Sequence, residues 1–127
     1  MAIKTPLVMA NGKPQQLQLG DTLAGQGIVA LTDAATITVD VSASSRFLLA
    51  SIGGNRTFVF SNDANGSQFW IDVTQDATGS RTITWPSGIR WMGGATGTPL
   101  ATAGKITQFA FVRISSGVYR GFQVNES

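Results

Sequence analysis

The chain has 127 residues, of which 43% are hydrophobic and only 13% are charged. The charged share is about half of the usual one, and a chain of this length can bury a core as a single domain. Because the sequence contains neither Cys nor His, it excludes disulfides, thiolate catalysis, cysteine-based zinc sites and imidazole chemistry. Nine basic and seven acidic residues give a net charge of +2 without a basic run, so nucleic acid is not an expected partner.

Polar and apolar residues alternate along most of the chain, and this period of two predicts an all-β protein. We interpret the pattern as a β-sandwich or jelly roll of about 8–10 short antiparallel strands, separated by turns rich in Asn, Asp and Gly. Residues 1–26 are less periodic and are interpreted as an N-terminal arm or the first strands, ahead of a sandwich domain over 27–127. The predicted strands in chain order cover 7–10, 15–19, 28–31, 36–41, 47–52, 57–60, 68–73, 81–85, 106–114 and 118–124. No apolar run approaches the length of a membrane helix, so no membrane partner is expected.

Two segments carry apolar residues outside this strand pattern. In the arm, Leu7 and Met9 lie among helix and strand breakers. Between 86 and 104, Gly and Pro are dense, yet Trp91 and Met92 are strongly apolar. A long loop of this kind must bury its apolar surface either on its own sandwich or on a partner. We therefore take Leu7, Met9, Trp91 and Met92 as candidate partner-binding residues.

The acidic residues predict no catalytic site. Five of the seven lie beside Gly, Ala, Asn or Thr in expected turns, where carboxylates commonly stabilise the turn itself. Asp40 and Asp72 fall on the expected solvent face of strands, where pairing with an Arg is the better interpretation than an acid–base dyad. The sequence thus predicts a protein that is not an enzyme and holds no cofactor or metal.

The tryptophans differ from the phenylalanines, which occupy alternating strand positions and are expected in the core. Trp70 has the opposite parity to Phe69 and Ile71, so it faces solvent or another chain. For Trp70 and Trp91 three interpretations remain open: an interface residue, a core residue, or a platform for a sugar. The candidate carbohydrate or interface residues are Trp70, Asp72 and Arg81.

The C-terminal half resembles small structural proteins of tailed bacteriophage virions, in particular a β module at the ends of tail fibres and in head-surface proteins. The resemblance covers about residues 55–124 and rests on a series of short motifs. These are Ile83-Thr84-Trp85-Pro86, Ile89-Arg90-Trp91, Gly93-Gly94, Pro99-Leu100, Gly104-Lys105, Phe109-Ala110-Phe111 and Tyr119-Arg120-Gly121. It implies a non-enzymatic, oligomeric virion part, often a trimer, without a cofactor.

Size then separates the possible positions on the virion. A chain of 127 residues has room for one compact domain and an arm, which fits a capsid decoration (cement) protein better than an elongated fibre. We expect such a protein to assemble in the host cytoplasm, to form a homotrimer and to bind across subunits of the major capsid protein on the head surface. The alternative is a tail-tip or tail-fibre receptor-binding module that recognises host surface carbohydrate.

Overall fold

The computed structural model describes residues 8–10, 13–15 and 25–127, with side chains from residue 27 onward. These ranges contain eleven β-strands and no helix, which confirms the all-β prediction. The strands are β1 (Val8–Ala10), β2 (Lys13–Gln15), β3 (Gly25–Ala30), β4 (Thr36–Asp40), β5 (Ser44–Ile52), β6 (Arg56–Ser61), β7 (Gln68–Gln75), β8 (Ile83–Thr84), β9 (Ile89–Trp91), β10 (Ile106–Ser115) and β11 (Val118–Asn125).

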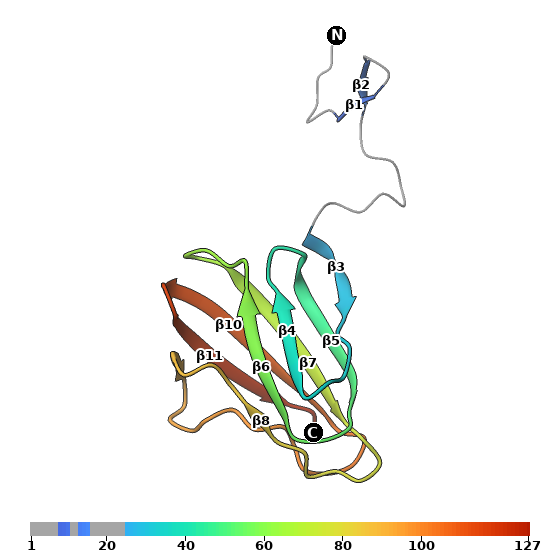
Figure 1. Cartoon of the computed structure of the whole chain (residues 1–127), viewed down its shortest axis with the longest axis vertical. Coiled ribbons are helices and arrows are strands. Elements are labelled where there is room, and N and C mark those ends of the chain that lie inside the picture. Colours follow the sequence, from blue (N-terminus) through green and yellow to red (C-terminus); the bar gives the residue numbers. More distant parts are fainter. Residues whose placement is uncertain (1–7, 11–12, 16–24) are drawn as a thin grey trace.

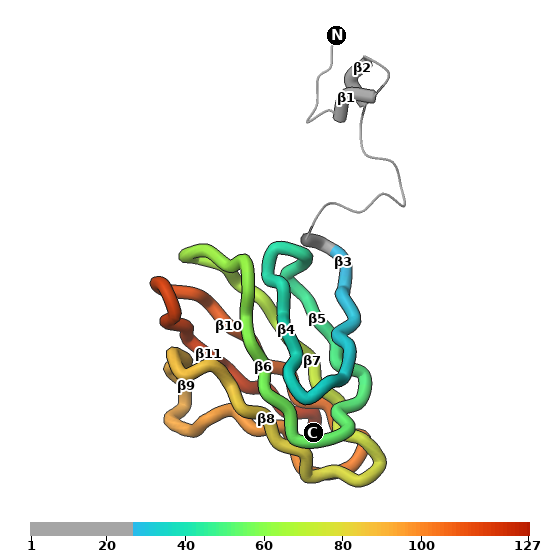
Figure 2. Tube along the Cα trace, in the orientation of Figure 1, coloured from blue at the N-terminus to red at the C-terminus, as the bar shows by residue number. Residues whose placement is uncertain are grey.

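Strands β3 to β11 form a sandwich of two sheets (Figure 1). The larger sheet has six strands in the order β3-β5-β7-β10-β11-β9, and the smaller has three in the order β4-β6-β8. From β3 to β8 the chain alternates between the two sheets, so it winds as a coil, which Figure 2 shows from blue to yellow. The β10–β11 hairpin then extends the larger sheet, and Gly117 in its turn has a φ of 72° that favours glycine.

The expectation of antiparallel strands is wrong for this coiled part. The pairs β3/β5, β5/β7, β4/β6 and β6/β8 are all parallel, and β9 is parallel to β11. Only β7/β10, β10/β11 and the separate β1/β2 pair are antiparallel among the described strands. Alternation along a strand indicates that one face is buried, but it carries no information on the direction of the neighbouring strand.

Aromatic rings fill the space between the two sheets. Trp85 packs against Phe58 and Phe109 with ring centroids 5.1 and 4.8 Å apart. Phe60 and Phe69 meet edge to face at 4.9 Å. Such contacts add to the stabilisation from buried apolar area. The aromatic core therefore holds the two sheets against each other.

The segment 86–104 packs on its own sandwich, which buries much of its apolar surface but leaves Met92 exposed. The buried Trp85 Nε1 donates to the carbonyl of Gly97 over 2.8 Å, and the backbone N–H of Leu100 donates to Thr107 Oγ1 over 2.8 Å. Trp91, in the short strand β9, packs against Trp85 with the ring centroids 5.6 Å apart. Sequence reasoning had no strand at β9, because three residues among Gly and Pro show too little alternation.

The proposed boundary between arm and domain is close to the start of β3 at Gly25. Within the region before it, β1 pairs with β2 in antiparallel register, with Met9 opposite Pro14. The side chain of Met9 and all of Leu7 lie outside the described part of the structure. The interaction role of the arm therefore stays a prediction.

Candidate functional site

The six-stranded sheet has one face turned away from β4, β6 and β8, which we call the outer face (Figure 1). In β7, Phe69, Ile71 and Val73 are buried in the core. Trp70 and Asp72, the residues between them, therefore point to the outer face. Trp70 is 38% exposed, as its parity in the sequence predicted.

The outer face is unusually apolar for a solvent-facing surface. Eight large hydrophobic side chains are exposed in the described region, and five of them lie on this face by strand alternation and register. Surfaces of this kind are typical of binding sites or of contacts with another chain. The five residues are Ile28, Trp70, Ile106, Phe122 and Val124.

An arginine covers part of the exposed tryptophan. Arg46 of β5 lies opposite Trp70 in the parallel register, and its guanidinium carbon lies 4.2 Å from the centroid of the indole ring. A cation this close to the ring is attracted to its π system. The contact holds two flat groups together at the surface and limits the rotamers of both.

Three hollows follow one another on the outer face. One of about 110 Å³ is lined by Ser45, Arg46, Gln68, Phe69 and Trp70. The next, about 80 Å³, shares Arg46 and Trp70 with it and adds Ile28, Leu48, Asp72 and Gln108. The third, about 320 Å³, shares Asp72 and Gln108 and extends to Ile106, Val124, Asn125 and Glu126.

Asp72 and Gln108 supply polar groups in the middle of this series. They face each other across the β7/β10 register. Within the described residues, no hydrogen bond or ion pair engages either side chain, whereas Asp33, Asp63 and Asp76 each pair with an arginine. A carboxylate and an amide of this kind can receive and donate hydrogen bonds to a ligand.

Arg81 does not join Trp70 and Asp72, contrary to the grouping made from the sequence. It lies between β7 and β8, where Nη2 pairs with Asp76 Oδ2 over 3.0 Å. The cation beside Trp70 is Arg46, which sequence reasoning missed. The sequence does contain a signal for Arg46. Phe47 and Leu49 are buried, so alternation along the strand places Arg46 on the outer face, but the predicted strand began one residue later, at Phe47.

The other candidate residues have separate positions. Trp91 is half-buried and packs against the core, where a side chain at Gly97 or Gly121 would collide with its ring. A partner-binding role for its exposed part stays a prediction. Met92 is exposed, but it lies outside the hollows of the outer face.

The remaining carboxylates in the described part of the chain have structural partners. A bidentate pair with Arg56 lowers the pKa of Asp33, and the hydrogen bond from the Gly53 N–H lowers it further. Burial and the charge of Asp76 act in the opposite direction but are outweighed. Ser42 and Asn62 lower the pKa of Asp40 by donating hydrogen bonds to it. In the ranges that the structure describes, no three acidic residues gather as metal ligands, and no helix is long and apolar enough to span a membrane.

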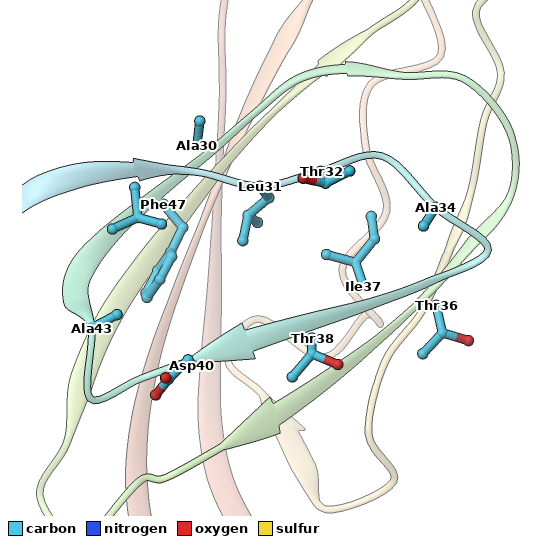
Figure 3. Close-up of a pocket in the computed structure, with 11 residues that line it drawn as sticks. Ala30, Leu31, Thr32, Ala34, Thr36, Ile37, Thr38, Asp40, Ala43 and Phe47 are labelled. Carbon is cyan, nitrogen blue, oxygen red and sulfur yellow. The ribbon is translucent and has the colours of Figure 1, made fainter.

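A further hollow, of about 320 Å³, opens between β3 and β4 (Figure 3). Leu31, Ile37 and Phe47 lie between the two ribbons, with threonines around them. Its one charged group, Asp40, already accepts hydrogen bonds from Ser42 and Asn62. This hollow therefore lacks the combination of exposed ring and unused polar groups found on the outer face.

Comparison with known proteins adds the family. A family model described as "Putative phage tail fibre C-terminal domain" matches residues 30–113, which cover β4 to β8, β9 and most of β10. No match was found among curated proteins or among solved structures. The expected resemblance to phage structural proteins is thus confirmed, while the preference for the head surface finds no support and the tail is favoured. The chain belongs to this family of phage tail fibre C-terminal domains and is a structural protein of the phage virion.

Proposed function

We propose that the chain is a receptor-binding module of the phage tail, and that its outer face recognises carbohydrate on the host surface without cleaving it. This replaces capsid decoration, which was the main interpretation of the sequence, by the alternative given with it. The family match supports a position on the phage tail. The position on the head was favoured mainly because of the length of the chain.

The observation that carries the proposal is the exposed Trp70 with Arg46 at its ring, beside Asp72 and Gln108, whose side chains make no hydrogen bond to any residue that the structure describes. Sugars present apolar C–H faces, which pack on aromatic rings, and hydroxyl edges, which need hydrogen-bond donors and acceptors. The outer face offers both within one hollow. A protein partner would also cover apolar surface, but it would not require unpaired polar groups at the centre.

A glycan array of bacterial surface polysaccharides tests the proposal, followed by adsorption to cells that carry the polysaccharide found. Trp70→Ala should reduce affinity about 30-fold, since removal of a central aromatic contact costs about 2 kcal/mol. Trp70→Phe keeps a ring and should retain part of the binding.

Val59→Ala is the matched control, because Val59 is also 38% exposed but lies in β6 of the smaller sheet. It should leave binding unchanged. If Trp70→Ala and Val59→Ala bind as the native chain does, the outer face is not the receptor site.

A further inference from the structure

The three hollows of the outer face form one track. The first and second share Arg46 and Trp70, and the second and third share Asp72 and Gln108. Neighbouring hollows are therefore adjacent, with the shared side chains at the boundary between them. We call this series, from Gln68 to Val124, the binding track.

Register gives the length of the binding track. Gln68 is four residues before Asp72 in β7. Asp72 lies opposite Gln108 of β10, which lies opposite Val124 of β11, so Val124 is two strands away from Asp72. With a rise of about 3.3 Å per residue and about 4.8 Å between strands, the two ends lie roughly 16 Å apart. That distance is several times the width of one six-membered sugar ring.

The chemistry also changes along the binding track in a way that suits a polymer. The Gln68 end has the flat Arg46–Trp70 pair, the centre has the polar Asp72 and Gln108, and the far end has the exposed apolar Ile106 and Val124. Each part can hold a similar unit by a different balance of apolar and polar contacts. Each hollow is shallow, so no single part encloses a sugar completely.

We propose that the binding track holds an internal stretch of a linear polysaccharide, several sugar units long, instead of a single terminal sugar. This rests on the proposed function, because it assigns the form of the carbohydrate that the same face recognises. Weak contacts to successive units add in one complex, and the ends of the polymer play no part in recognition.

The test uses the full chain and size-fractionated oligosaccharides cut from the polysaccharide that the array identifies. Calorimetry should show an affinity that rises with length, beyond the statistical gain from repeated units, and then levels off once the track is covered. Gln68→Ala and Val124→Ala, at opposite ends of the outer face, should each lower affinity for the long oligosaccharides about two- to tenfold and leave the shortest unaffected. Val124 is 61% exposed, so its variant should fold, and melting temperatures confirm this for both variants.

The outcomes separate the two proposals. If a single repeating unit binds as tightly as long oligosaccharides, and Trp70→Ala still weakens that binding about 30-fold, the extended site is wrong and the receptor-binding function stands. If no oligosaccharide binds while a protease-sensitive receptor on the cells is bound, both proposals fail. The length series needs no variant, so a misfolded variant cannot obscure the result.

Discussion

The strongest structural prediction concerns Trp85→Phe. The indole Nε1 of Trp85 donates to the Gly97 carbonyl over 2.8 Å, and both residues are buried. Phenylalanine preserves an aromatic ring at the centre of the core but cannot donate this hydrogen bond. The substitution therefore tests whether Trp85 fastens the segment 86–104 to the sandwich.

Two losses add in this variant. A buried carbonyl left without a donor costs about 1–3 kcal/mol, and the smaller ring leaves a gap worth about 1–2 kcal/mol. We expect a total near 3 kcal/mol, which corresponds to a decrease in Tm of about 10–15 °C for a domain of this size. Against a typical stability of about 5–15 kcal/mol, the variant should still fold.

Trp91→Phe is the matched control. Trp91 is half-buried, and its Nε1 makes no hydrogen bond within the described residues, so we expect a decrease in Tm of only about 3–5 °C. Urea unfolding followed by far-ultraviolet circular dichroism gives both free energies of unfolding. Equal losses for the two variants, or a loss below about 1 kcal/mol for Trp85→Phe, would refute the role of the hydrogen bond to Gly97.

The remaining predictions address pH, packing and assembly. Burial, followed by a hydrogen bond to Asp63, raises the pKa of Tyr119 to about 12. The stability that its neutral phenol contributes should be complete below pH 10 and be lost as the pH rises from 10 to 12, and Tyr119→Phe should remove this alkaline decline in unfolding curves. A Cβ at Gly88 would lie 1.5 Å from the Gly117 carbonyl, so Gly88→Ala should separate β9 from β11 and increase amide exchange in β9, whereas unchanged exchange would contradict this packing. Light scattering at micromolar concentration should show a homotrimer, and a 13 kDa monomer would remove that expectation. Deletion of residues 2–20 should leave the melting temperature of the sandwich unchanged, and loss of folding would show that the arm is part of the domain.

Strand positions could be predicted well from the sequence because one face of each long strand is buried. Thr36–Asp40 and Gln68–Gln75 show this, since their buried residues alternate as expected. The coil of parallel strands could not be predicted, because the direction of a partner strand depends on how the connections cross between sheets. The short strand β9 was missed for a different reason, as its pairing with β11 depends on the hairpin formed later in the chain.

The candidate site was predicted in part. The parity of Trp70 and Asp72 placed both correctly on an outward face, because that property is local to one strand. Arg46 comes from a neighbouring strand 24 positions earlier in the chain, and only the β5/β7 register brings it to the indole. The prediction that Arg81 joins Trp70 and Asp72 was wrong, because the sequence around it does not indicate that it pairs with Asp76.

The most direct test of carbohydrate recognition by the outer face is a nuclear magnetic resonance titration of the labelled chain with an oligosaccharide from the host polysaccharide. We expect shift changes to concentrate at Arg46, Trp70, Asp72 and Gln108, including the indole N–H of Trp70. Changes confined to the hollow between β3 and β4, or to the segment 86–104, would contradict carbohydrate recognition by the outer face.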